Sequence, residues 1–128
     1  MNLGAMRHLI HFYKPKQITN KLGDVKTCYF YAFSSWASKS ELSSDESVEN
    51  AKQIATIKTL FKTRFCPINT SFIMLFNGND LNAPKKLKTA LLKSGDEVYE
   101  IISVIDKMGL KKELEITAQI KEKRSENA

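Results

Sequence analysis

Two histidines and two cysteines are the residues of this 128-residue sequence best suited to metal binding or nucleophilic catalysis. His8 and His11 are three positions apart in a segment with strand-like alternation, so they point to opposite faces and cannot share a metal ion. A zinc site also needs three or four ligands. Cys28 and Cys66 are far apart and form no CxxC motif, so we expect two reduced, partly buried thiols in a cytosolic setting.

The carboxylates and glycines form no arrangement typical of catalysis. A serine-rich segment, residues 38–50, holds Glu41, Asp45, Glu46 and Glu49, for which simple exposure to solvent is the ordinary interpretation. The five glycines are scattered and make no phosphate-binding loop. Neither cysteine has an indicated base and orienting group. We therefore expect a protein that is not an enzyme and that uses no cofactor and no metal.

The charge of the chain is moderate and unevenly distributed. Lys and Arg number 20 against 14 Asp and Glu, and this net charge of +6 is compatible with a polyanion without identifying a dedicated nucleic-acid binder. The segment 79–94 carries Lys85, Lys86, Lys88 and Lys93, opposite in sign to the acidic segment. No stretch approaches the roughly 20 apolar residues of a membrane-spanning helix, and no secretory signal is evident, so we expect no membrane association.

Six short extended segments account for most of the hydrophobic pattern. Strict alternation over residues 113–121 places Leu114, Ile116, Ala118 and Ile120 on one face of a half-buried strand. The other five segments are residues 7–13, 25–33, 55–65, 71–76 and 98–106. Because the connections are short and no βαβ alternation is present, the pattern predicts an all-β fold, a small antiparallel six-stranded β-barrel.

The remaining segments complete a single predicted domain over residues 1–121. Lys14-Pro15 is expected to end the first strand, because proline has no N–H to donate to a neighbouring strand. Residues 38–50 are predicted to form a long polar loop. Residues 79–94 form a short insertion in which Pro84 and Gly95 favour the start and stop of a helix. Residues 122–128 are predicted to be a flexible tail.

The second predicted strand is rich in aromatic side chains: Tyr29, Phe30, Tyr31 and Phe33, followed by Trp36. Small barrels that bind single-stranded nucleic acid stack bases on such side chains. The alternative is core packing together with a face between subunits. We favour this alternative because basic residues are not interleaved with the aromatic ones along the sequence, as stacking sites usually require.

The order of these features resembles the phage head–tail joining proteins, also called head-closure, stopper or head–tail adaptor proteins. The residues that carry the resemblance are Met6-Arg7-His8-Leu9-Ile10, Leu22-Gly23, Trp36-Ala37, the polar Glu-bearing loop, residues 55–64 ending in Arg64, residues 71–78, Val98-Tyr99-Glu100-Ile101-Ile102-Ser103-Val104 and Leu114-Glu115-Ile116. Each motif is short, and it is their order and spacing that match. Residues 79–94 depart from the pattern, since family members usually pass directly from the glycine turn into the tyrosine-containing strand.

The resemblance implies a structural virion protein of a tailed phage, which joins the DNA-filled head to the tail and closes or gates the DNA channel. It implies a ring on the order of twelve copies in the virion, formed from a protein that is a monomer in isolation. The implied partners are further copies of the chain, a portal or adaptor protein, a tail or tail-completion protein, and packaged DNA that passes without sequence-specific binding. The implied locations are the head–tail interface and, during assembly, the host cytoplasm.

A ring requires a head-to-tail interface on every subunit, and the two charged segments are natural candidates for it. We expect one of them to contact a neighbour or the channel and the other to contact a ring above or below. The expected contact residues are Glu41, Asp45, Glu46, Glu49, Lys85, Lys86, Lys88 and Lys93. Two alternatives remain open: a small β-barrel that binds single-stranded nucleic acid, and a related tail-completion or connector subunit.

Overall fold

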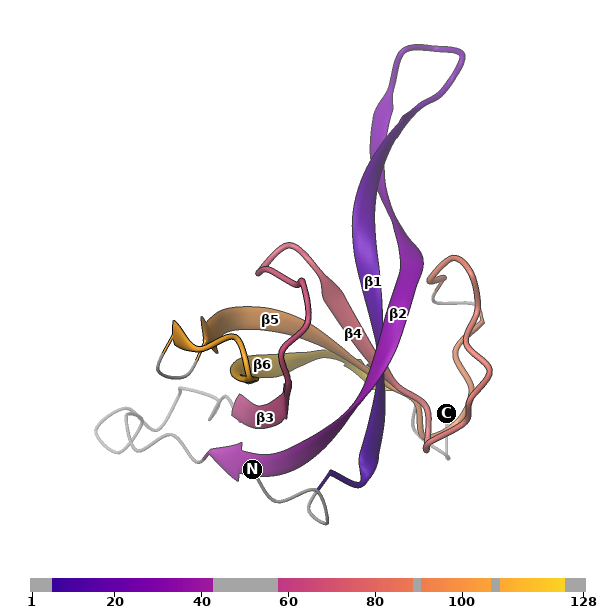
Figure 1. The fold of residues 1–128 in the computed structure, drawn as a ribbon. Helices are drawn as coiled ribbons and strands as arrows, with labels where there is room; N and C mark the ends of the chain where they lie inside the picture. The colour runs from indigo at the N-terminus through magenta and orange to yellow at the C-terminus, as the bar shows by residue number, and fades with distance from the viewer. Residues whose placement is uncertain (1–5, 43–57, 89–90, 107–108, 124–128) are drawn as a thin grey trace, which may run out of the picture.

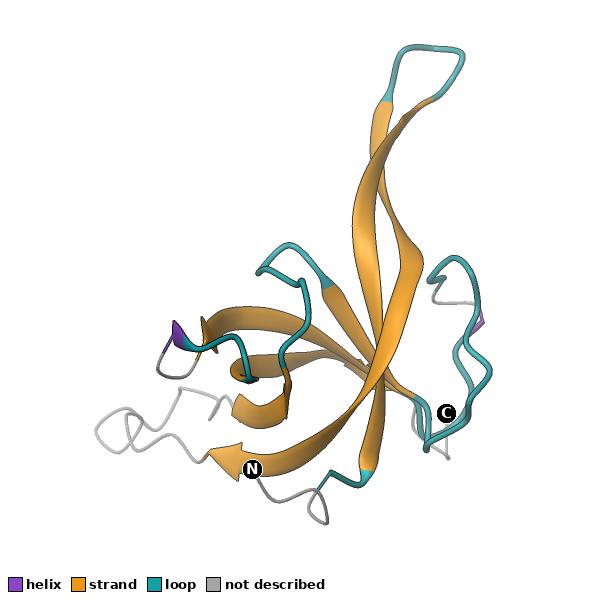
Figure 2. Cartoon of the chain, viewed as in Figure 1, coloured by secondary structure: helices purple, strands orange, loops and turns teal. Residues whose placement is uncertain are grey.

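The computed structural model describes residues 6–42, 58–88, 91–106 and 109–123, and nearly all regular structure in these ranges is β (Figure 2). The strands are β1 (His8–Thr19), β2 (Val25–Leu42), β3 (Lys58–Arg64), β4 (Ile73–Phe76), β5 (Glu97–Asp106) and β6 (Glu113–Lys123). They form one closed antiparallel barrel in the order β1-β2-β3-β6-β5-β4. The prediction of an all-β, six-stranded barrel is confirmed. In the described part of the chain, no helix has the length and apolar character needed to cross a membrane.

Side chains from all six strands fill the interior of the barrel. The alternation in β3 turns Thr59, Phe61 and Thr63 inward, and Phe61 packs edge-on against Tyr99 of β5 with ring centroids 5.1 Å apart. Burying each large apolar side chain contributes roughly 1.5–3 kcal/mol, so this cluster is the main source of stability. Its buried members are Ile10, Phe12, Ala37, Phe61, Phe72, Met74, Tyr99, Ile101, Leu114, Ile116 and Ala118.

Beyond the barrel, β1 and β2 continue as a long two-stranded hairpin, which projects well away from the other strands (Figure 1). The reason lies in the lengths of the neighbouring strands. β4 pairs with β1 only as far as Tyr13, and β3 pairs with β2 only from Ala37 onward. Between Lys14↔Phe30 and Thr19↔Val25 the two strands pair with each other. We call this hairpin, residues 14–30, the arm.

The arm corrects the prediction that Lys14-Pro15 ends the first strand. Pro15 lies inside β1 and is in register with Tyr29. A proline is tolerated in a strand when its missing N–H would have faced an open edge, and β4 does not reach this part of β1. Since Lys14 and Lys16 flank the proline, the same edge is also protected from pairing with a foreign strand.

Two further boundaries differ from the sequence prediction. β2 continues to Leu42, so the first five residues of the predicted loop 38–50 are strand residues that pair with β3. β6 continues to Lys123, because its last residues pair with the start of β5 across a register shift. Ile120, expected on the core face, is 41% exposed. Residues 43–50 of the predicted loop and residues 124–128 of the predicted tail lie outside the described residues.

The described residues of the insertion 79–94 do not form the helix that Pro84 and Gly95 favoured. They run in an extended path, apart from a 3₁₀ turn at Leu91, and pass beside the base of the arm (Figure 1). The physical reason is that β2 offers an open edge at this level, with backbone groups that an extended segment satisfies. Tertiary pairing therefore outweighs the local helical preference of the lysine- and leucine-rich sequence.

Candidate protein-interaction site

The insertion adds a short third strand to the base of the arm. Lys86 forms a β-bridge with Phe30 of β2. Two backbone hydrogen bonds flank the bridge: Tyr31 N–H to the Lys85 carbonyl at 2.8 Å, and Leu87 N–H to the Tyr29 carbonyl at 2.9 Å. Because these bonds hold the edge of β2 where β3 does not reach, residues 85–87 brace the arm against the barrel.

A buried histidine fixes the beginning of the insertion. The His11 side chain is completely buried, and its Nε2 lies 2.9 Å from the carbonyl oxygen of Asp80 and 3.1 Å from Oδ1 of Asn77. Both partners are acceptors, so Nε2 carries a proton and donates it. Nδ1 lies 2.6 Å from the hydroxyl of Ser34 on β2. His11 therefore links β1 to β2 and to the insertion, and its role in the fold is structural.

A second hydrophobic cluster lies outside the barrel, under the insertion. Tyr13 is its most deeply buried member, and its hydroxyl donates a 2.7 Å hydrogen bond to the carbonyl oxygen of Pro84. Burial raises the pKa of Tyr13 to about 12, so the hydroxyl keeps its proton at any physiological pH. Leu87 and Leu92 of the insertion cover the cluster from outside. The other members are Tyr29, Ile73, Leu75 and Val98.

The positive charge of the protein is concentrated on the arm and on residues 85–88 of the insertion, which we call together the basic face. These two segments hold seven lysines and one acidic residue, Asp24, a net charge of +6. Removing them from the 20 basic and 14 acidic residues of the chain leaves 13 of each, so the rest of the protein is neutral. The lysines are Lys14, Lys16, Lys21, Lys26, Lys85, Lys86 and Lys88.

The fold brings basic and aromatic side chains together in a way that the sequence did not indicate. Lys16 of β1 and Lys86 of the insertion each place Nζ over the Phe30 ring, 5.9 and 5.8 Å from its centroid. These lysines are distant from Phe30 in sequence, so only the strand pairing reveals the cluster. The ring is half-buried and lies within cation–π distance of both ammonium groups, so basic and aromatic side chains that are separated in the sequence are adjacent in the fold.

The tip of the arm presents two exposed apolar side chains on a hydrogen-bonded turn. Leu22 is 87% exposed and Val25 is 61% exposed. The turn between them is held by Asn20, whose Oδ1 accepts hydrogen bonds from the backbone N–H groups of Leu22 and Asp24 at 2.9 Å each. Gly23 adopts a positive φ of 87°, which other residues rarely tolerate. The two exposed apolar side chains are therefore presented on a fixed turn.

The residues predicted as contact sites fall at opposite ends of the fold. Glu41 is exposed near the end of β2 that is remote from the arm, and Asp45, Glu46 and Glu49 lie outside the described residues. The structure places three of the four predicted lysines, Lys85, Lys86 and Lys88, on the basic face. It sets Lys93 apart from them, at a turn where its backbone N–H donates to Asp96 at 2.8 Å. The sequence analysis did not predict the arm and did not name its lysines as contact residues.

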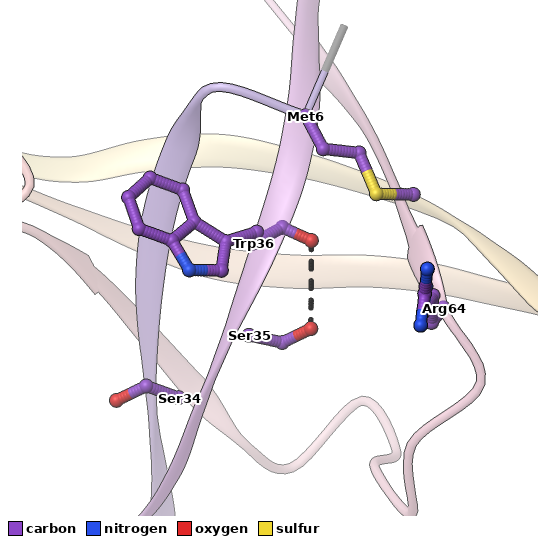
Figure 3. A pocket seen from close by; sticks show the side chains of 5 residues that line it. All are labelled: Met6, Ser34, Ser35, Trp36 and Arg64. Carbon is purple, nitrogen blue, oxygen red and sulfur yellow. Dashed lines mark hydrogen bonds between the residues drawn. The ribbon is translucent and has the colours of Figure 1, made fainter. Parts of the chain in front are cut away.

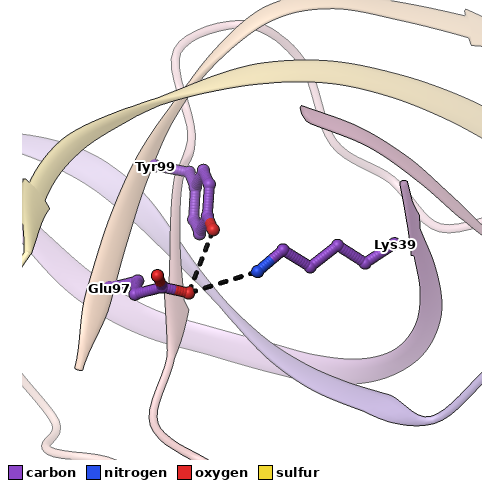
Figure 4. A network of polar contacts seen from close by, with 3 residues as sticks. All are labelled: Lys39, Glu97 and Tyr99. Atoms are coloured by element: carbon purple, nitrogen blue, oxygen red, sulfur yellow. Dashed lines mark hydrogen bonds and ion pairs between the residues drawn. The ribbon is translucent and has the colours of Figure 1, made fainter. Parts of the chain in front are cut away.

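A polar network links Lys39 of β2 to Glu97 and Tyr99 of β5 (Figure 4). Oε1 of Glu97 lies 3.3 Å from Nζ of Lys39 and accepts a 3.0 Å hydrogen bond from the Tyr99 hydroxyl. Burial alone would lower the pKa of Lys39, but the contacts with Tyr99 and Glu97 outweigh it and raise the pKa. Nearby, burial and then the charge of Lys39 lower the pKa of His8. Lys39, Glu97 and Tyr99 therefore supply one another with polar partners.

A shallow surface hollow of about 580 Å³ lies beside the strand edge of β2 (Figure 3). It is lined by Met6, Ser34, Ser35, Trp36 and Arg64, and Trp36 is 45% exposed. Trp, Met and Arg are enriched where proteins contact one another. The hollow is therefore suited to contact with a protein surface, in line with the expectation that some of the aromatic residues serve a face between subunits.

The cysteines and histidines stay apart. Cys28 is buried and Cys66 half-buried, both as free thiols, and burial raises the pKa of Cys66 to about 11. Over residues 6–42, 58–88, 91–106 and 109–123, no three His, Cys, Asp or Glu side chains come close enough to hold a metal ion.

The fold is that of a small closed β-barrel with a projecting basic hairpin. The family model of the phage head completion protein matches residues 1–122, so the chain belongs to that family. This membership supports a structural role in the phage head, within the virion. The resemblance noted from the sequence is thereby confirmed at the level of the family.

Solved structures show the same fold at low sequence identity. The solution structure of protein SF1141 from Shigella flexneri 2a superposes with a TM-score of 0.59 at 21% identity, covering 94% of this chain and 96% of that one. A chain from the virion of a native gene transfer agent particle gives 0.50 at 14% identity, covering 88% and 92%. At these identities the similarity concerns the fold. A comparison with curated protein sequences finds no match.

Proposed function

We propose that this protein completes the phage head by joining it to the tail, as a ring that closes or gates the DNA channel. Membership in the phage head completion family over residues 1–122 is the observation that carries the proposal. The similarity to a chain of a gene transfer agent virion is consistent with it, because that protein is itself part of an assembled particle.

The distribution of charge supports a subunit with two different contact ends. Glu41 lies near one end of the 18-residue strand β2, and the basic face begins at the other. In this proposal the acidic residues Glu41, Asp45, Glu46 and Glu49 contact a neighbouring copy or the channel. The basic residues, including Lys85, Lys86 and Lys88, contact the portal or adaptor ring or the tail. A head-to-tail interface between neighbouring copies closes into a ring under cyclic symmetry, on the order of twelve copies.

The direct test compares the isolated protein with the protein in particles. The molar mass in solution, measured by light scattering, should be that of a monomer, and electron microscopy of particles should place the protein in a ring at the head–tail vertex. Deleting the gene should yield DNA-filled heads and separate tails that fail to join. A soluble monomer that is absent from particles, or a deletion that leaves joined particles intact, would overturn the proposal.

Measuring oligonucleotide binding by the isolated protein at several salt concentrations addresses the nucleic-acid alternative. A dedicated binder of single strands predicts tight, salt-sensitive binding of oligonucleotides by the isolated monomer. A joining protein predicts feeble binding of free DNA together with stable incorporation into particles.

A further inference from the structure

The arm projects from the barrel and is held by specific contacts at its base and at its turn. Its base is held by the bridge between Lys86 and Phe30 and by the hydrogen bond from Tyr13 to Pro84. Its turn is held by the side chain of Asn20. A projecting element that is rigid before binding loses little conformational entropy when it docks, so this construction favours a binding role.

We infer that the arm docks into an apolar pocket with an acidic rim on another protein of the particle. In this arrangement Leu22 and Val25 enter the pocket, and the lysines of the basic face lie against carboxylates around it. The inference rests on the proposed function, because it requires the protein to be assembled into a particle. It goes beyond that function by assigning the contact to the arm and stating the chemistry of its partner.

The chemistry of the tip favours a protein partner over DNA. An apolar centre surrounded by charged groups is the usual plan of a protein–protein contact. Phosphates would use the lysines but leave Leu22, at 87% exposure, without a partner. The arm also contains no arginine, the residue that most often reads DNA bases. A base that stacked on Phe30 would compete with Lys16 and Lys86, whose ammonium groups lie 5.9 and 5.8 Å from the centroid of its ring.

The charge balance favours a different protein over a second copy of this chain. The basic face carries the entire net charge of +6, and the remainder of the chain is neutral. Neighbouring arms would repel one another, and the carboxylates with which a second copy could attract an arm are chiefly those of its acidic segment, residues 38–50, an arrangement that the crosslinking test below distinguishes from contact with a different protein. Docking by strand addition is also disfavoured, because Lys14, Pro15 and Lys16 lie on the open edge of β1. The contact is therefore assigned to the tip and faces of the arm.

The first test compares variants of the arm with matched variants of the opposite hairpin, which joins β5 to β6. Leu22→Asp introduces a charge at the tip, and Leu110→Asp does the same at a leucine that is 56% exposed in the control hairpin. The pair K16E/K26E reverses charge on the arm, and K111E/K112E does so in the control. Each variant is checked by circular dichroism and thermal melting, and its amount in purified particles is measured by quantitative mass spectrometry.

We expect the two arm variants to fold and to fall by about tenfold or more in particles, as loss of a central contact residue produces. The two control variants should stay within about twofold of the wild type, like most surface substitutions. If the wild-type protein is present in particles and the arm variants are present at the same level, the docking inference is wrong and the proposed function stands. If the wild-type protein is itself absent from particles, the docking inference and the proposed function are both wrong.

The second test identifies what lies against the tip. A photoreactive phenylalanine analogue at position 22, activated in intact particles, should form a crosslink to a peptide of another particle protein that contains both apolar and acidic residues. Crosslinks to DNA, crosslinks only to other copies of this chain, or the absence of any crosslink above that of the same analogue at position 110 would each overturn the inference.

Discussion

The hydroxyl of Tyr13 donates a 2.7 Å hydrogen bond to the carbonyl oxygen of Pro84, across 71 positions of the chain. This contact joins the strand that leads into the arm to the insertion that braces it. Together with the bridge at Lys86, it makes the position of the arm depend on residues 79–94, the segment that is unusual relative to the joining proteins the sequence resembles.

Replacing Tyr13 with phenylalanine should lower the free energy of unfolding by about 1–2 kcal/mol, because the Pro84 carbonyl loses its partner in a buried site. Urea denaturation measures this loss. Tyr29→Phe is the matched control, since Tyr29 belongs to the same cluster and none of the hydrogen bonds found in the described structure uses its hydroxyl. The control should change stability by less than about 0.5 kcal/mol. Equal losses in both variants would contradict the role given to the bond.

Replacing His11 with phenylalanine should be more costly, about 2–4 kcal/mol, because the substitution removes three polar contacts. The carbonyl of Asp80 loses the imidazole donor, and the hydroxyl of Ser34 keeps its hydrogen bond with the Tyr31 hydroxyl but loses the one with His11. The insertion should loosen as a result, which hydrogen exchange of the Leu87 amide would show as faster exchange. A variant that unfolds more easily but keeps full protection at Leu87 would mean that His11 stabilises the barrel and not the insertion.

Much of the barrel followed from the sequence because alternation is a local signal. Residues 113–121 alternate almost without exception, and β6 buries Leu114, Ile116 and Ala118 as predicted. The arm could not be predicted from the sequence, because Pro15 is incompatible with a central strand but acceptable at an open edge. Whether an edge is open depends on where β4 ends, which the sequence near Pro15 does not encode.

The candidate site was predictable only in part for a related reason. The charge of Lys85, Lys86 and Lys88 was visible in the sequence, whereas their proximity to the lysines of the arm comes from one bridge between Lys86 and Phe30. The prediction of a helix between Pro84 and Gly95 was wrong, because residues 85–87 pair with an open edge of β2 instead. A local propensity of a few tenths of a kcal/mol per residue is easily outweighed by such pairing.

The protein should lose stability as the pH falls below neutrality, partly because of His8. Its pKa in the folded state is lowered from the ordinary value of 6.5, first by burial and then by the charge of Lys39. The unfolded chain therefore binds the proton more readily, and protonation below about pH 6.5 favours unfolding. Nδ1 of His8 is also buried and has no hydrogen-bond partner in the described structure.

Replacing His8 with glutamine should remove this contribution. Urea denaturation of both proteins between pH 8 and pH 5 should give a constant difference in unfolding free energy above about pH 7.5, and below it the variant should gain relative to the wild type. Comparing the two proteins cancels the titration of the carboxylates. A wild type that gains relative to the variant on acidification would show that the folded state favours protonated His8.

Cys66 should react slowly with alkylating reagents. Burial raises its pKa to about 11, so about 0.1% of the thiol is ionised at pH 8, against about a quarter for an ordinary cysteine. Iodoacetamide labelling at pH 8, followed by mass spectrometry of the Cys66 peptide, should therefore be at least about a hundredfold slower in the folded protein than in urea. Equal rates would show that the thiol is exposed or ionised in the folded state.

The backbone pairing of residues 85–87 with β2 can be tested with two proline variants that remove different backbone N–H groups. Leu87→Pro deletes the N–H that donates to the Tyr29 carbonyl at 2.9 Å. Lys86→Pro deletes an N–H that takes no part in the two bonds flanking the bridge, and an extended segment accepts proline at such a position. Leu87→Ala controls for the loss of the leucine side chain.

Hydrogen exchange of the Tyr31 amide, which donates to the Lys85 carbonyl at 2.8 Å, reports on the brace directly. We expect about tenfold faster exchange or more in Leu87→Pro, as the loss of one net hydrogen bond implies, and smaller effects in the other two variants. If Lys86→Pro releases the Tyr31 amide as strongly as Leu87→Pro does, the segment is held by its side chains, and the insertion does not brace the arm through backbone pairing.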